Sequence, residues 1–153
     1  MSPAGSSPAT RSVLLPLLTT SLQEYLGLPY ASPPLGPLRF LPPSPASPWS
    51  GGETSGLARK PSCPQLQEGG VTGREDCLYL NIATPNRESG ELLPVMVFIH
   101  GGAFVSKAPG DSLYGAKLMV EQGVLLVTLN YRLGALGWLT TLTSQAPGNL
   151  GLR

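Results

Sequence analysis

Three stretches in the second half of the chain carry the hydrophobic patterns of β-strands. Residues 77–84, CLYLNIAT, alternate in character and are rich in strand-forming residues. Residues 94–99, PVMVFI, and residues 124–129, VLLVTL, are short, continuous apolar runs. Continuous runs of this length are typical of strands that are buried on both faces. We therefore expect one alternating strand and two fully buried strands in this part of the chain.

A helix is predicted between the two apolar runs. Asp111 or Ser112 can cap its first turn, apolar residues recur along it as far as Gln122, and Gly123 fits a left-handed stop. Strand, helix and strand in this order form a βαβ unit with parallel strands and a right-handed crossover, which predicts an α/β fold class. A parallel sheet needs helices on both faces, and only one convincing helix is present. We therefore expect an incomplete mixed, mainly parallel sheet with an exposed edge and an exposed apolar face.

The first half of the chain has a different character, because eleven of the 17 prolines precede residue 51. Residues 1–20 are rich in Ser, Pro and Ala without any period, so we expect a flexible lead-in to a folded portion over residues 21–153. Residues 21–50 are expected to form an extended, polyproline-like arm that aromatic side chains hold against the globular surface, since prolines at this density disfavour helix and central strand. Residues 51–74 are interpreted as a loop.

Composition narrows the classes of function. The net charge is +1 and no basic run exceeds Arg59-Lys60, so the chain lacks the features of a nucleic-acid-binding protein. No apolar run approaches the ~20 residues of a membrane helix. The apolar stretch after Arg11 is short and broken by Pro16, which makes it a poor secretory signal. With His100 as the sole histidine and two cysteines, a zinc site of several His and Cys ligands cannot be assembled, and we expect neither a metal nor a cofactor.

A glycine pair follows the first apolar run directly, in FIHGGAF (98–104). Gly101 and Gly102 allow the backbone to turn sharply and to approach a ligand without interference from a Cβ atom. The pair lies at the carboxyl end of a predicted parallel strand, where open α/β sheets place their sites. N–H groups that point out of such a turn can stabilise an oxyanion. The alternative is a glycine turn that serves packing alone.

Five blocks of this sequence resemble the type-B carboxylesterases and cholinesterases, and they occur in the order found in that family. The blocks are YLGLPYASPPLGPLRF (25–40), EDCLYLNIATP (75–85), FIHGGAF (98–104), NYRLGALGWL (130–139) and PGNLGLR (147–153). The resemblance implies an α/β-hydrolase fold, of which this chain would carry the N-terminal portion. Most members of the family are serine esterases, and some relatives are non-catalytic adhesion proteins.

The resemblance also assigns roles by position. HGGA corresponds to the oxyanion loop of the family, whose donors would be the backbone N–H groups of Gly102 and Ala103, with Gly101 shaping the turn. His100 is interpreted as a structural residue of this loop, because the nucleophile, acid and histidine of the fold follow later in the chain. No Gly-x-Ser-x-Gly elbow is present, since GDSLYG (110–115) has one residue too many. The chain is therefore expected to stop before the elbow and to lack nucleophile, acid and base.

Two hypotheses for the function follow. In the first, the chain is the N-terminal fragment of a serine carboxylic-ester hydrolase. It supplies the oxyanion loop, is inactive in isolation, and has a small-molecule ester as the substrate of the full-length protein. In the second, it is a non-catalytic adhesion or binding relative that keeps the fold without the chemistry. By resemblance alone, the protein would be secreted or would reside in the lumen of the endoplasmic reticulum.

Three structural contacts are implied by the resemblance as well. Cys63 and Cys77 match a disulfide of the family, and the alternative is a pair of reduced thiols. Arg39 and Glu75 match an ion pair that ties the proline-rich arm to the sheet, and the alternative is a solvated, unpaired arginine. Arg132 would require an acidic partner from further along the chain, which these 153 residues do not supply.

Overall fold

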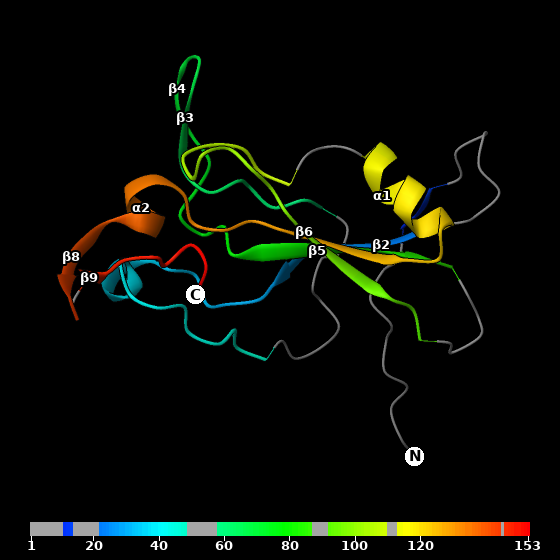
Figure 1. Cartoon of the computed structure of the whole chain (residues 1–153), viewed down its shortest axis with the longest axis horizontal. Helices are drawn as coiled ribbons and strands as arrows, with labels where there is room; N and C mark the ends of the chain where they lie inside the picture. The colour runs from blue at the N-terminus through cyan, green and yellow to red at the C-terminus, as the bar shows by residue number, and fades with distance from the viewer. Residues whose placement is uncertain (1–10, 14–21, 49–57, 87–91, 110–112, 145) are drawn as a thin grey trace.

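The structure is a computed structural model that describes residues 11–13, 22–48, 58–86, 92–109, 113–144 and 146–153. Its main element is a mixed, five-stranded sheet in the order β1-β2-β5-β7-β6, with helix α1 on one side (Figure 1). The strands of this sheet are β1 (Arg11–Val13), β2 (Leu22–Pro29), β5 (Tyr79–Pro85), β6 (Val95–Ile99) and β7 (Leu125–Leu129).

Smaller elements lie around this sheet. A hairpin projects from the body of the molecule, and a short helix with a second hairpin lies at one end (Figure 1). These elements are β3 (Gln65–Gln67), β4 (Gly70–Thr72), α1 (Leu113–Glu121), α2 (Gly134–Trp138), β8 (Thr140–Thr143) and β9 (Ala146–Pro147), with a 3₁₀ turn at Gly36–Leu38.

The predicted βαβ unit is confirmed. Strands β6 and β7 pair in parallel, from Val95 opposite Leu125 to Ile99 opposite Leu129, and α1 lies between them in the chain. Gly123, two residues after the end of the helix, has φ +74°, and its N–H donates to the carbonyl of Val120, as expected for a left-handed stop. The proposed caps at Asp111 and Ser112 lie outside the described residues.

The prediction that β6 is buried on both faces is wrong. All five side chains of β6 are between 45% and 60% exposed, and β6 forms one edge of the sheet. A continuous apolar run indicates the surroundings that a strand requires, but neighbouring elements must supply them. Among the described residues, no strand pairs with the free edge of β6. The expected exposed edge and apolar face are therefore present in the structure.

The interpretation of residues 21–50 as an arm without a central strand is also wrong over its first part. Strand β2 lies inside the sheet, between β1 and β5, and its alternate residues Leu22 and Glu24 are buried. The prolines that disfavour a strand begin only at Pro29, where β2 ends. A register shift between Tyr25 and Leu28 bends the strand.

Two shorter strands also depart from the expectations. The β3–β4 hairpin falls within residues 51–74, which were expected to form a loop, and its antiparallel pairing runs from Gln65 opposite Thr72. Strand β1 falls within the expected flexible lead-in and pairs with β2, while the remainder of residues 1–20 lies outside the described residues.

Two hydrophobic clusters form the core. The first joins the disulfide to the strand ends near the glycine loop and consists of Ala31, Cys63, Cys77, Leu78, Tyr131 and Leu133. The second lies between α1 and the sheet and consists of Leu22, Ala83, Val120 and Leu126, with Ala116 packed against it. The first cluster supports the carboxyl end of the parallel strands, where a site was expected.

Candidate functional site

The glycine loop begins where β6 ends, at the carboxyl end of a parallel strand. Three consecutive residues have left-handed backbone: Gly102 (φ +120°), Ala103 (φ +51°) and Phe104 (φ +63°). A Cβ atom on Gly102 would lie 2.0 Å from the carbonyl oxygen of Ser106, whereas a Cβ on Gly101 would meet nothing within 4 Å. The steric need for glycine therefore falls on Gly102, and the structure gives Gly101 no comparable role in shaping the turn.

The direction of the two candidate donors follows from the carbonyl groups beside them. In a trans peptide the C=O and the following N–H point in opposite directions. The carbonyl of Gly101 accepts a hydrogen bond from His100 Nδ1 at 2.8 Å, so the N–H of Gly102 points away from His100. The carbonyl of Gly102 accepts from the backbone N–H groups of Val105 at 3.0 Å and Ser106 at 3.1 Å. The N–H of Ala103 consequently points out of the turn.

Neither candidate donor takes part in a strand ladder. Strand β6 ends at Ile99, and within the described part of the chain the N–H groups of Gly102 and Ala103 form no backbone hydrogen bond. Ala103 is exposed and Gly102 is half-buried. The turn therefore leaves two adjacent backbone donors directed away from their own loop.

His100 is held in place within the protein. Its side chain is buried, its ring stacks on Tyr131 with centroids 4.4 Å apart, and its carbonyl accepts a hydrogen bond from the Tyr131 hydroxyl at 2.7 Å. Burial raises the pKa of Tyr131, which therefore remains a donor. Since a carbonyl can only accept, Nδ1 of His100 carries the proton in its bond to Gly101. The imidazole thus orients the peptide between Gly101 and Gly102, which is a structural role in the loop.

Gln65, which sequence reasoning did not identify, anchors the far end of the loop. Its side chain is buried at the start of β3, where Oε1 accepts from the backbone N–H of Lys107 at 2.7 Å and Nε2 donates to the Lys107 carbonyl at 3.1 Å. Nε2 also lies 3.3 Å from the carbonyl of Cys63. The loop is therefore tied to the disulfide region. In the sequence, the only indication of this anchoring role was a polar residue two positions after Cys63.

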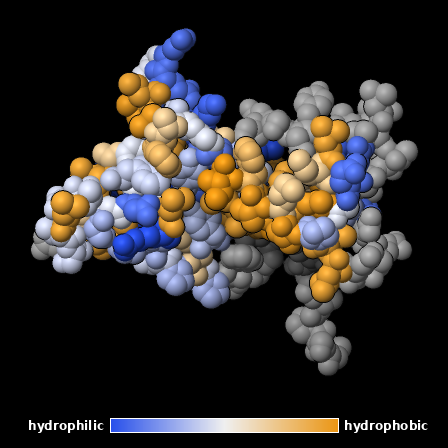
Figure 2. Space-filling view, in the orientation of Figure 1, coloured by the Kyte–Doolittle hydropathy of each residue, from blue (hydrophilic) through white to orange (hydrophobic). Residues whose placement is uncertain are grey.

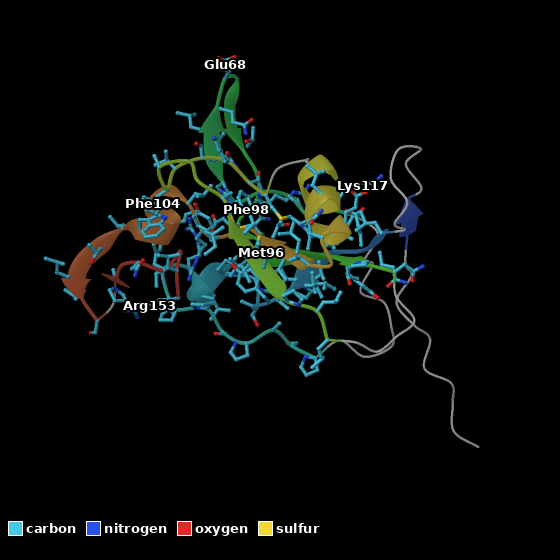
Figure 3. All side chains as sticks on the ribbon, turned by 45° about the vertical axis from the view of Figure 1, so that its right-hand side comes forward. Glu68, Met96, Phe98, Phe104, Lys117 and Arg153 are labelled. Carbon is cyan, nitrogen blue, oxygen red and sulfur yellow. A yellow bond between two sulfur atoms is a disulfide. The ribbon has the colours of Figure 1, made fainter. Side chains whose placement is uncertain are left out.

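The loop also contacts α2. The ring of Phe104 packs on Trp138 with centroids 4.3 Å apart, and the carbonyl of Phe104 accepts from the N–H of Gly134 at 2.7 Å. Figure 3 shows Phe104 beside this helix. Gly151 closes on the same helix, because its N–H donates to the carbonyl of Gly137 at 3.0 Å. Sequence blocks that are distant along the chain therefore meet around the loop.

The structure brings together both residue pairs implied by the resemblance. Cys63 and Cys77 form a disulfide with Cα atoms 5.0 Å apart, which confirms that prediction. Arg39 Nε donates to Glu75 Oε2 at 2.7 Å, and the two side chains are 44% and 30% exposed. At this exposure the pair contributes only about 0–1 kcal/mol to stability.

Arg132 is buried, and most of its guanidinium nitrogens lack a hydrogen-bond partner among the described residues. Nη1 donates to the carbonyl of Leu41 at 2.9 Å, but Nε and Nη2 have no hydrogen-bond partner among the described residues. Burial lowers the pKa of Arg132, and nearby Tyr30 opposes this shift. The pKa of Tyr30 itself is raised by burial to about 12. Within the described part of the chain, Arg132 therefore has no acidic partner.

The described residues contain no group of three or more His, Cys, Asp or Glu side chains arranged to hold a metal ion. No helix among them is long and apolar enough to cross a membrane. A groove of about 260 Å³ lies on the sheet beside α1 and is lined mainly by apolar residues of β2, β5, β6 and β7, away from the glycine loop.

Comparison with known proteins identifies the family. The sequence model of the Carboxylesterase family matches residues 15–153. The chain belongs to the carboxylesterase family. It is 44% identical to the juvenile hormone esterase of Tribolium castaneum, with 85% of this chain and 23% of that protein aligned. It is 40% identical to the acetylcholinesterase of Bungarus fasciatus, where the alignment covers 94% of this chain and 26% of that protein.

A third relative, the acylcarnitine hydrolase of Mus musculus, is 44% identical, with 85% of this chain and 26% of that protein aligned. This carboxylesterase-family chain therefore spans about a quarter of the length of the curated relatives it matches. The family has the α/β-hydrolase fold, and the mixed sheet with its βαβ unit is a part of that fold. These three relatives are named as ester hydrolases, which agrees with the first of the two function hypotheses.

Proposed function

We propose that the glycine loop supplies the oxyanion hole of a serine carboxylic-ester hydrolase, with the backbone N–H groups of Gly102 and Ala103 as donors. The substrate is a small-molecule carboxylic ester. A serine hydroxyl from outside these 153 residues attacks the ester carbonyl, and the negative charge that develops on the carbonyl oxygen is stabilised by the two N–H groups. The tetrahedral intermediate then expels the alcohol and leaves an acyl-enzyme, which water hydrolyses.

The orientation of the two peptides is the observation that carries this proposal. His100 Nδ1 and the N–H groups of Val105 and Ser106 hold the carbonyls of Gly101 and Gly102, so the following N–H groups point away from the loop. Donors that are fixed before the reaction need no reorganisation when the oxyanion forms. The same feature favours the hydrolase over a non-catalytic binding relative, since a binding protein has no need of oxyanion donors.

The 153-residue chain is proposed to be inactive by itself, because donors without a nucleophile have no covalent step to assist. We expect no saturable hydrolysis of a nitrophenyl ester by the purified chain. Saturable hydrolysis that persists after controls for contaminating esterases would contradict this part of the proposal.

The loop can be tested in a chimera in which this chain replaces the matching quarter of the Tribolium castaneum juvenile hormone esterase. In that chimera, Gly102→Ala should lower kcat for a nitrophenyl ester by about 10²- to 10³-fold, because a Cβ atom 2.0 Å from the Ser106 carbonyl must displace the donors. Gly101→Ala is the matched control, since its Cβ meets nothing within 4 Å. Equal kcat values for the two variants would refute the assignment.

A further inference from the structure

Both ends of the glycine loop are supported by the protein around them, and the two supports come from different parts of the chain. At the first end, the Tyr131 hydroxyl donates to the carbonyl of His100 at 2.7 Å, and His100 Nδ1 donates to the carbonyl of Gly101 at 2.8 Å. At the second end, the Gln65 side chain bonds both the N–H and the carbonyl of Lys107. The loop is therefore an arch that is held at both ends.

The Cys63–Cys77 disulfide joins these two supports. Gln65 follows Cys63 by two residues, and its Nε2 lies 3.3 Å from the Cys63 carbonyl. Cys77 lies just before β5, and the carbonyl of Tyr79, the first residue of that strand, accepts from the N–H of Asn130 at 3.0 Å. Asn130 directly precedes the tyrosine that supports the first end of the loop. A continuous path of bonds thus runs from one end of the arch to the other through the disulfide.

The base of the arch is buried and closely packed. Cys63 and Cys77 are 1% and 0% exposed, and they belong to the same hydrophobic cluster as Tyr131. A Cβ atom on Gly73 would lie 2.5 Å from the carbonyl oxygen of Cys63, so the backbone beside the disulfide is in tight contact. Interiors packed in this way transmit a displacement to neighbouring groups. The covalent bond therefore fixes how far apart the two ends of the loop lie.

We propose that the Cys63–Cys77 disulfide is a positioning element for the backbone N–H groups of Gly102 and Ala103. The inference rests on the hydrolase proposal, in which these two groups donate to the oxyanion. The disulfide takes no part in the reaction itself and acts through the supports at the two ends of the loop. Because a misplacement of about 1 Å can cost about 10²-fold in rate, a small change in the separation of the ends is enough to affect turnover.

The chimera with the Tribolium castaneum juvenile hormone esterase provides the kinetic test. Replacing Cys63 and Cys77 together with serine should lower kcat for a nitrophenyl ester by about 10- to 100-fold. KM should change little, because the donors act on the transition state more strongly than on the bound ester. A rise in KM at unchanged kcat would contradict the positioning role.

Leu22→Ala is the matched control for a general loss of stability. Leu22 is buried in the cluster between α1 and the sheet, in the part of the molecule where Figure 2 shows hydrophobic side chains gathered over β6 and α1. It pairs with Pro85, at the opposite end of β5 from Tyr79. A buried leucine-to-alanine change and the loss of a disulfide destabilise proteins to a similar extent. Leu22→Ala should nevertheless leave kcat unchanged.

Gln65→Leu is a second variant that retains the disulfide, so the test does not depend on the folding of the serine variant. It should also lower kcat, because it frees the second end of the loop. The two changes should not be additive. Once Gln65 is replaced, loss of the disulfide should lower kcat little further, since the bond then has only one end of the loop to hold.

Amide hydrogen exchange in the 153-residue chain separates this inference from the hydrolase proposal, which Gly102→Ala and Gly101→Ala test. The N–H groups of Val105 and Ser106, which donate to the Gly102 carbonyl, should exchange faster in the serine variant than in Leu22→Ala. If the chimera is inactive, this comparison decides the role of the disulfide.

Four results would overturn the proposal. The first is an equal kcat for the serine variant and the unmodified chimera, and the second is an equal fall in kcat for Leu22→Ala. The third is full additivity between loss of the disulfide and Gln65→Leu. The fourth is equal exchange of the Val105 and Ser106 N–H groups in the serine variant and in Leu22→Ala.

Discussion

Replacing Gln65 with leucine should release the glycine loop from the disulfide region. The Gln65 amide makes two well-formed hydrogen bonds to the backbone of Lys107, at 2.7 and 3.1 Å, and a longer one to the carbonyl of Cys63. A typical hydrogen bond contributes roughly 0.5–1.5 kcal/mol, so loss of the two bonds to Lys107 should lower the free energy of opening of this segment by about 1–3 kcal/mol. The longer bond at 3.3 Å adds little.

Amide hydrogen exchange measured by NMR gives a direct readout of this opening. A loss of about 1–3 kcal/mol corresponds to exchange of the Lys107 N–H that is roughly 5- to 150-fold faster. The N–H of Leu125, which donates to the carbonyl of Pro94, reports on the sheet and should change little. This comparison separates local release of the loop from a general loss of stability.

Gln67→Leu is the matched control for this experiment. Gln67 lies on the same strand, is exposed, and has only a 3.5 Å contact with Gln65. Exchange at Lys107 in Gln67→Leu should therefore resemble that of the unmodified chain. If Gln65→Leu and Gln67→Leu accelerate exchange at Lys107 by the same factor, the anchoring role of Gln65 is wrong.

Three other perturbations test the supporting structure. Arg132→Met should raise the urea midpoint of the chain by an amount equivalent to about 1–4 kcal/mol, because a buried, largely unpaired guanidinium is removed. The exposed Arg153→Met should leave the urea midpoint unchanged. Equal midpoints for Arg132→Met and the unmodified chain would refute this expectation. Burial raises the pKa of Tyr30 to about 12, above its unfolded value of 10.0, so stability present below pH 10 should fall as pH rises toward 12. In unfolding curves measured at alkaline pH, Tyr30→Phe should show a smaller loss of stability between pH 10 and 12 than the unmodified chain. An equal loss of stability in the two proteins would contradict this expectation. Replacing Cys63 and Cys77 together with serine should lower the free energy of unfolding by about 3 kcal/mol in urea titrations, and a negligible change would contradict the loop-entropy account.

The sequence predicted the parallel βαβ unit and the place of the site because both depend on local signals. Continuous apolar runs at 94–99 and 124–129, with a helix between them that stops at Gly123, leave few alternatives to parallel pairing. The glycines after the first run indicated where the backbone turns at the carboxyl end of β6. The sequence did not distinguish their roles, and the structure places the steric demand on Gly102.

The prediction for β2 failed because it extended the effect of the later prolines to residues 22–29. The burial of alternate residues in β2 depends on the pairing of this strand with β5, which only the structure shows. The role of Gln65 was equally hidden, because its partner Lys107 lies 42 residues away in the chain. A glutamine two residues after a cysteine carries no local signal for a contact at that separation.

The amino-acid sequence by itself determined the βαβ unit, the glycine turn and the family, because these depend on residue types and on spacing along the chain. Tertiary structure alone decided which backbone donors point outward and which strand face is exposed. Those properties depend on partners that the fold brings together, such as His100 with the carbonyl of Gly101, and on the neighbours that a strand such as β6 acquires at each edge. A hydrophobic run specifies that a strand requires burial, but only the assembled structure shows whether a neighbour provides it.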